Sequence, residues 1–252
     1  MELRPDPLLG NRRPVRGIDG DSLLVAGSIP MTTRFALGQR LGLTRAQTDL
    51  LLRLRTPERI QDFITSLSIN HELNGDSCLS VVGVLEHRHA HCIEGAFVAA
   101  CALWLQGEPP LLMDFHAEGD DDHVVTLFKR GDCWGAISKS NHVWLRWRDP
   151  VYRTLRELAI SYIHEYVNES KKTLRAYSRP FDLRRVAPER WVTNPEPCWD
   201  VAEELDGIRH YRLISKAQAR RLRDRDDFEQ HLGRQVEFIS PKKRGARTAA
   251  RS

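Results

Sequence analysis

The sequence predicts an α+β fold in which a buried helix packs on an antiparallel sheet. Helical periodicity begins at Leu43, a segment that is apolar nearly all round follows over residues 92–107, and an alternating pattern of period two begins at Leu111. Helices grouped before strands are typical of α+β folds, whereas α/β folds alternate the two. The predicted order is a helical N-terminal part, the buried helix, an antiparallel meander and C-terminal helices.

Composition divides the chain into four predicted regions. Residues 1–42 are rich in Pro, Gly and Arg and predict an irregular N-terminal extension with one short strand at Ser22–Ala26. Residues 43–182 carry most of the periodic segments and predict the core. Residues 183–240 predict a C-terminal extension with a charged helix. Residues 241–252 are basic and offer almost no apolar side chain to bury, so we expect a disordered tail.

Capping signals place the first helices. Thr44, with Gln47 three residues later, forms a capping box ahead of an apolar run. Thr56 as N-cap and Pro57 at the first helical position predict a second helix that runs to about Ser66. A third helix is predicted by apolar residues at helical spacing, namely Leu79, Val82 and Leu85.

The segment Cys92–Gly107 predicts a helix that is buried on every side. It is rich in small apolar residues and ends in glycine, which commonly terminates helices. Strands and turns alternate after it: a strand at Leu111–Phe115, an acidic turn at 119–122, a strand at His123–Phe128, a hairpin turn at 129–132 and the partner strand Cys133–Ser138.

Two further helices are predicted after this sheet. Pro150 opens a long amphipathic helix with an apolar face made of Val151, Leu155, Leu158, Tyr162 and Tyr166. Ser215 with Gln218 caps a highly charged helix that runs to about Leu232. Residues 220–226 of that helix carry charges of both signs, so they indicate a solvated helix rather than a phosphate-binding surface.

The composition is that of a globular protein without a membrane span. Of the 252 residues, 41% are hydrophobic and 29% are charged. No apolar run approaches the ~20 residues that cross a bilayer, and Met1–Pro7 lacks the pattern of a signal peptide, so we expect a cytoplasmic protein. The five cysteines include no CxxC pair, which in a reducing compartment favours free thiols that are either buried or reactive.

Cys92 is the candidate reactive thiol. In the first turn of a helix, unpaired N–H groups and a partial positive charge stabilise both a thiolate and the oxyanion of acyl transfer. A thiol nucleophile also needs a general base and a polar group that orients the base. His123 opens a strand after the acidic turn and is the candidate base. The hairpin brings three polar residues near enough to orient it: Ser138, Ser140 and Asn141.

These residues resemble the transglutaminase-like superfamily. The resemblance rests on Cys92-x-Glu94-Gly95-Ala96, a Leu/Trp/Gly end to that helix, an intervening strand, a histidine opening the next strand, and a Gly turn before Trp134; it covers about Thr56 to Ser138. It implies a papain-like core with a Cys-His-Asp triad, and a cysteine hydrolase or acyltransferase that acts on amide bonds of a peptide or protein. Where the superfamily usually has Asp, this chain has Ser138-Lys139-Ser140-Asn141, and papain-like enzymes use Asn in that role. The superfamily also includes inactive relatives, so a catalytically inactive interaction module is the alternative.

Other motifs allow competing interpretations. His87, His89, His91 and Cys92 offer ligand types suited to zinc, but no second group with CxxC or HxxxH spacing follows, so we expect a polar loop with His91 capping the helix, and no metal or cofactor. Asp120–Asp122 has the ligand type of a calcium site, although a solvated acidic turn is the simpler interpretation. The basic C-terminus raises a nucleic-acid-associated function as a second alternative, which the mixed charges of residues 220–226 do not favour.

Several candidates also have a purely structural interpretation. Cys92 is then a core cysteine, as Cys101 is expected to be within its helix and Cys133 on its strand. Glu94, in the first helical turn, is either catalytic or a partner of the helix dipole. The tryptophans that lie near arginines predict an edge strand with one buried face rather than a base-stacking surface: Trp134, Trp144 and Trp147.

Overall fold

The computed structural model describes residues 30–73 and 75–240. Its α-helices are α1 (Met31–Arg40), α2 (Arg45–Arg53), α3 (Pro57–Ser66), α4 (Val81–His87), α5 (Cys92–Gln106), α6 (Leu155–Ile160), α7 (Trp199–Asp206), α8 (Lys216–Ala219) and α9 (Asp227–Gly233). Its strands are β1 (Ser68–Ile69), β2 (His89–Ala90), β3 (Leu111–Ala117), β4 (His123–Arg130), β5 (Cys133–Ile137), β6 (Trp147–Tyr152), β7 (Val167–Asn168), β8 (Lys171–Lys172), β9 (Leu174–Ser178), β10 (Phe181–Asp182) and β11 (His210–Arg212). Short 3-10 helices lie at Val143–Leu145, Leu183–Arg185 and Pro188–Arg190.

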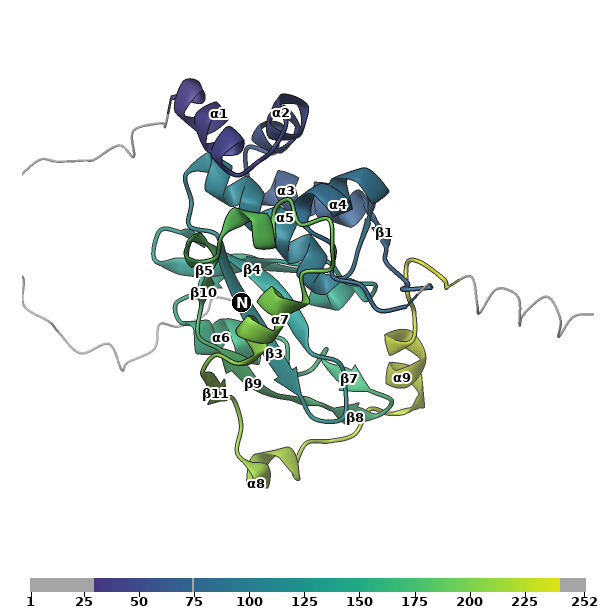
Figure 1. Cartoon of the computed structure of the whole chain (residues 1–252). Coiled ribbons are helices and arrows are strands. Elements are labelled where there is room, and N and C mark those ends of the chain that lie inside the picture. Colours follow the sequence, from purple (N-terminus) through teal and green to yellow (C-terminus); the bar gives the residue numbers. More distant parts are fainter. Residues whose placement is uncertain (1–29, 74, 241–252) are drawn as a thin grey trace, which may run out of the picture.

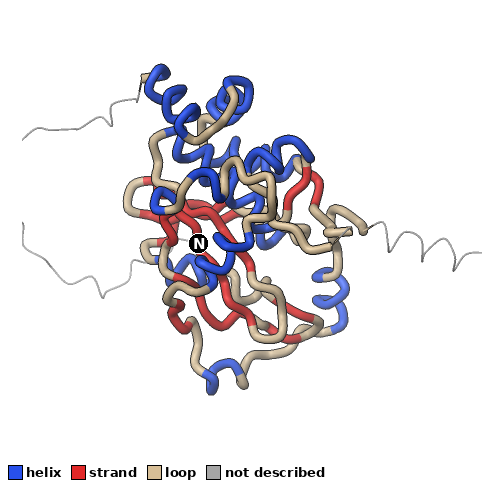
Figure 2. The backbone as a smooth tube through the Cα atoms, viewed as in Figure 1, coloured by secondary structure: helices blue, strands red, loops and turns tan. Residues whose placement is uncertain are grey.

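The predicted α+β class is confirmed. A seven-stranded sheet has the order β11-β9-β3-β4-β5-β6, with β10 paired to β3, and its neighbours are antiparallel. The helices α1–α4 lie above this sheet in Figure 1, and Figure 2 shows the strands grouped below them. None of the helices in the described ranges is long and apolar enough to cross a membrane. The strand expected at Ser22–Ala26 and the tail expected at 241–252 lie outside the described residues.

The N-terminal helices begin where their caps predict. Thr44 accepts a hydrogen bond from the Gln47 amide at 3.2 Å, and the Gln47 side chain returns one to the Thr44 amide at 2.9 Å. Thr56 caps α3, with Pro57 at its first position. One expectation was wrong here: residues 31–40, assigned to an irregular extension, form α1. Their helix begins without a side-chain cap, so the sequence carried no capping signal for it.

The helix α5 is the centre of the helical layer. Twelve of its fifteen residues are buried, which fits the all-round apolar pattern, and it ends at Gly107, whose φ of 94° lies in the left-handed region that favours glycine. It packs between the helices α2, α3 and α4 and the strand β4. Gly95 lets it approach the chain after β5 closely, because a Cβ at this position would lie 2.6 Å from the Cβ of Lys139.

The sheet separates two hydrophobic clusters and fixes the hairpin that carries the site. Arg130 pairs with Cys133 across a two-residue turn, so Thr126 pairs with Ile137 further along β4 and β5. Val124 faces the cluster around α5, and Val125 faces the cluster around α6. Side chains alternate between the two faces as a strand requires.

The long helix expected to open at Pro150 does not form. Residues 147–152 form the edge strand β6, where a proline is tolerated because one side of the strand has no partner. The helix α6 begins later, at a capping box between Thr154 and Glu157, and it ends at Ile160. Trp147 stacks on Phe128 with ring centroids 5.2 Å apart, as expected for an edge strand with one buried face. The same expectation was wrong for Trp134, which lies on the interior strand β5, and for Trp144, which is exposed on a 3-10 helix.

The C-terminal part is more integrated than the sequence suggested. The charged helix expected from Ser215 to Leu232 is two short helices, α8 and α9, because a second capping box between Asp226 and Glu229 starts a new helix. The helix α7 and the strand β11 were not predicted. Val201 and Leu205 of α7 belong to the same hydrophobic cluster as α5.

Candidate thiol active site

Cys92 occupies the first position of α5, as predicted, and its side chain is partly buried. The thiol lines a cavity of about 260 Å³ that is also lined by His123, Asn141 and Tyr166. The first N–H groups of a helix have no partner within it, so the start of α5 offers donors and a partial positive charge beside the sulfur.

His123 begins β4 and is held by Ser138. The Nε2 atom of the imidazole lies 2.7 Å from the Ser138 hydroxyl, and both residues are buried. When Nε2–H donates to that hydroxyl, Nδ1 is the ring nitrogen left to face a thiol. The His123 side chain lies near enough to the Cys92 thiol to lower its pKa. The structure thus brings Cys92, His123 and Ser138 together.

Gln61 fixes the position of Ser138, a role that the sequence analysis missed. Its side-chain amide donates to the Ser138 carbonyl at 3.0 Å and accepts from the Ser138 amide at 3.0 Å. Because Gln61 belongs to α3, it links the helical layer directly to the end of β5. A glutamine inside a short helix gave no sequence signal for this contact.

His91 also interacts with the Cys92 sulfur and raises the stability of its thiolate. The Nε2 atom of His91 lies 2.7 Å from the Ser77 carbonyl and 3.4 Å from a Glu94 carboxylate oxygen. Burial alone lowers the pKa of an imidazole, but the contacts with Cys92, Glu94 and the Ser77 carbonyl outweigh it and raise the pKa of His91 to about 9. A cationic His91 therefore flanks the thiol at neutral pH.

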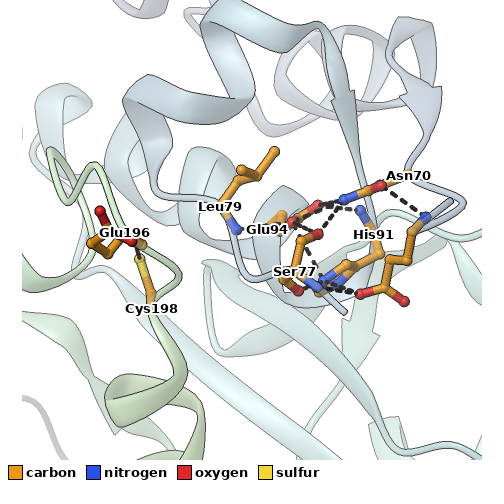
Figure 3. Close-up of polar contacts among 8 residues, drawn as sticks. Asn70, Ser77, Leu79, His91, Glu94, Glu196 and Cys198 are labelled. Carbon is orange, nitrogen blue, oxygen red and sulfur yellow. Dashed lines mark hydrogen bonds and ion pairs between the residues drawn. The ribbon is translucent and has the colours of Figure 1, made fainter. Parts of the chain in front are cut away.

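Glu94 organises the loop beside His91. Its fully buried carboxylate accepts hydrogen bonds from the His91 amide at 2.7 Å and the Leu79 amide at 2.8 Å, and from the side chains of Asn70 and Ser77 at 3.1 Å (Figure 3). Both oxygens are thus engaged with the loop before α5. This arrangement favours the structural interpretation of Glu94 over a catalytic one.

These contacts make Cys92 unlike the other buried thiols. Burial raises the pKa of a thiol, and it raises that of Cys101 to about 12. At Cys92 the hydrogen bonds and charges of His123 and His91 outweigh burial and lower the pKa to about 5. A thiolate paired with imidazolium is the expected state at neutral pH.

Asn141, expected to orient His123, is hydrogen-bonded elsewhere. Its side-chain amide donates to the Phe238 carbonyl at 2.9 Å and accepts from the Phe238 amide at 2.8 Å. The Ser140 hydroxyl accepts from the His142 amide at 3.0 Å and stays within its own loop. Of the three polar residues weighed from the sequence, Ser138 is the one bonded to the imidazole.

The motifs with metal-ligand composition are engaged in other contacts. His87 stacks on His89 with ring centroids 5.7 Å apart, so these rings pair with each other. Asp120 accepts from Thr173, and Asp122 accepts from the Ala117 amide and lies 3.3 Å from His116. Within residues 30–73 and 75–240, the group of side chains whose ligand atoms converge is an exposed one: His116, Asp122 and Asp206.

Comparison with models of known protein families and with curated protein sequences finds no match.

Proposed function

We propose that this protein is a transglutaminase-like cysteine hydrolase or acyltransferase that acts on amide bonds of a peptide or protein. The observation that carries the proposal is the thiol of Cys92, at the start of α5 between His91 and His123, with its pKa lowered to about 5. A structural core cysteine has no need of two imidazoles, whereas a nucleophile needs a group that keeps it ionised and a group that handles the proton.

The chemistry follows from this pairing. The Cys92 thiolate attacks the amide carbon, a C–S bond forms, and the carbonyl oxygen becomes an oxyanion beside the first N–H groups of α5. Protonated His123 gives its proton to the leaving amine as the C–N bond breaks, which leaves an acyl-thioester and a neutral imidazole. Neutral His123 then takes a proton from water or from a second amine, which releases the acid or a new amide and restores the thiolate.

Ser138 and Gln61 act as positioning residues in this scheme. The Ser138 hydroxyl holds Nε2 of His123, and Gln61 holds the Ser138 backbone. A neutral hydroxyl stabilises an imidazolium less than a carboxylate does, so His91 and the helix terminus supply the remaining stabilisation of the thiolate.

A second candidate function is an inactive interaction module. It is favoured by the hydroxyl of Ser138 in the position where the superfamily usually has Asp. The nucleic-acid alternative receives no comparable support from residues 220–226. Arg223 forms ion pairs with Asp226 and Glu229, and Arg225 forms one with Glu165.

Turnover of amide bonds separates these functions. The full-length chain is incubated with a peptide library rich in Gln and Lys, with and without a fluorescent primary amine, and the products are identified by mass spectrometry. Hydrolysis or amine incorporation that disappears in Cys92→Ala and falls strongly in His123→Ala supports the enzyme. A folded protein that forms no product and no thioester with any peptide supports the module.

A further inference from the structure

A second set of contacts surrounds the same cavity. The loop from Lys139 to Arg146 contacts Glu237 and Phe238, nearly a hundred residues further along the chain. This C-terminal stretch follows α9, which stands beside the sheet at the right of Figure 1. Lys139 and Asn141 of this loop line the cavity together with Cys92, so the loop borders the space that the thiol faces.

Asn141 holds the backbone of this stretch. Besides the two bonds from its side-chain amide to Phe238, its own carbonyl accepts from the Glu237 amide at 3.3 Å. The side-chain amide of Asn141 thus bonds both the N–H and the C=O of Phe238. Bonds to the main chain hold a peptide irrespective of its side chains.

Two buried cations contact the side chains. Arg146 lies 2.5 Å from the Glu237 carboxylate, and its Nε atom donates to the Ser140 carbonyl at 2.8 Å, which holds the guanidinium in place. The Lys139 ammonium lies 4.8 Å from the centre of the Phe238 ring. Burial and the neighbouring Arg146 lower the pKa of Lys139 to about 8, although Glu237 opposes this.

One acid neutralises this pair of cations. Among the described ion pairs, over residues 30–73 and 75–240, Glu237 is the one carboxylate bonded to Arg146, whereas the Lys139 ammonium donates to the carbonyls of Leu67 and Thr65. Two like charges held together in a buried site are costly unless an acid neutralises them. An aromatic ring over the ammonium adds a cation–π contact at the next position of the peptide.

From these contacts we infer that the loop Lys139–Arg146 is a peptide subsite that binds a bent segment with an acidic residue followed directly by an aromatic one. The chain's own Glu237–Phe238 occupies it. That such a peptide is a substrate rests on the proposed function. That such a peptide binds to the loop does not depend on the proposed function. Because the occupant is tethered, its effective concentration excludes weak peptide ligands until it is displaced.

The test opens the subsite in the full-length chain. The variant Glu237→Ala/Phe238→Ala is titrated against a fluorescein-labelled, capped peptide with the sequence of residues 235–239, and binding is followed by fluorescence anisotropy. The opened variant should bind at least roughly tenfold more tightly than the unaltered chain, in which the tethered segment competes. The matched control is Val236→Ala, which changes an exposed neighbour in the same stretch and should bind as the unaltered chain does.

Two further arms test the named contacts. Adding Asn141→Ala to the opened variant should abolish binding, and a peptide with Gln and Ala in place of Glu and Phe should bind the opened variant at least about tenfold more weakly, since an ion pair and an aromatic contact are lost. Should the double substitution unfold the chain, Glu237→Gln alone keeps the ring in place and should give an intermediate affinity.

The outcomes separate the subsite from the enzyme. No gain in peptide affinity in a folded opened variant overturns the subsite and shows that Glu237–Phe238 is only a structural contact, whatever the reactivity of the thiol. Binding with the expected sequence preference, in a chain whose Cys92 alkylates like an ordinary thiol, supports the subsite and overturns the thiol enzyme. Binding that ignores the Glu and Phe side chains overturns the acidic–aromatic preference.

Discussion

At the scale of single residues, the low pKa of Cys92 depends on the imidazoles of His123 and His91. The contact with His123 was expected from a histidine opening a strand after an acidic turn. The contact with His91 was not, because a histidine directly before the thiol appeared to be a cap or a loop residue. Its Nε2 bond to the Ser77 carbonyl aims the ring, and Ser77 comes from a loop whose course the sequence did not indicate.

Cys92 should alkylate at low pH. In a Cys133→Ser background, which removes the other thiol that is not fully buried, the rate of iodoacetamide labelling should reach half its maximum near pH 5, where the Cys92 thiolate forms. Replacing either flanking residue, His91→Ala or His123→Ala, should move that midpoint upward. Cys101, whose pKa is raised to about 12, is the internal control and should stay unlabelled. A midpoint near pH 8.5 would contradict the ion pair.

At the scale of elements, helix α3 holds the end of β5 through one glutamine. Gln61→Ala should destabilise the fold by about 1–3 kcal/mol, because the buried N–H and C=O of Ser138 would lose their partners. It should also raise the midpoint of Cys92 alkylation, since Ser138 holds His123. Gln47→Ala in α2, which loses only an exposed capping contact, is the control and should leave that midpoint unchanged. Urea unfolding and the labelling profile measure both effects.

The helix α5 should tolerate no side chain where it crosses the loop after β5. Gly95→Ala places a Cβ 2.6 Å from the Lys139 Cβ and should cost about 1–3 kcal/mol through overpacking. The matched control is Gly83→Ala in α4, whose Cβ would meet its nearest neighbour at 3.4 Å; there the better helix propensity should leave the stability unchanged or up to about 1 kcal/mol higher. Equal effects at both glycines would show that the approach of α5 to Lys139 is not tight.

Elements with local signals were predicted well, and elements that depend on distant partners were not. The local signals lie within a few residues of one another in the sequence, as in the capping boxes at Thr44 and Ser215 and in the two-residue hairpin turn. The strand β11 forms only because β9 lies beside it, and α1 begins without a side-chain cap. The pairing of Asn141 with Phe238 spans 97 residues, so spacing could not reveal it.

At the scale of the whole molecule, the helical layer and the sheet meet where the thiol lies. The start of α5, the start of β4, the loop after β5 and the end of α9 all border one cavity. The helix was predictable from its own composition, and the succession of β3, β4 and β5 from the turns between them. The placement of the C-terminal chain beside them was not, because its contacts are single polar bonds with no periodic pattern.

The ion pair at the site should make the stability of the molecule depend on pH in a defined window. The pKa of Cys92 is lowered from 9.0 to about 5, so its contribution is present above pH 9 and is lost as the pH falls towards 5. The pKa of His91 is raised from 6.5 to about 9, so its contribution is complete below pH 6.5 and is lost as the pH rises towards 9.

Between pH 6.5 and 9 the folded pair holds one proton, on His91, and the unfolded pair also holds one, on Cys92, so stability should be flat there. Between pH 6.5 and 5 the unfolded state binds one proton more, and the folded state should lose stability as the pH falls. Urea unfolding of the unaltered chain and of Cys92→Ser is followed across pH 5–9. The comparison isolates this effect, since the remaining ionisable groups, such as the Asp114 carboxyl, titrate in both proteins. The difference between the two curves should be level above pH 6.5 and fall below it; a difference that is constant down to pH 5 would mean that Cys92 enters the fold as a neutral thiol.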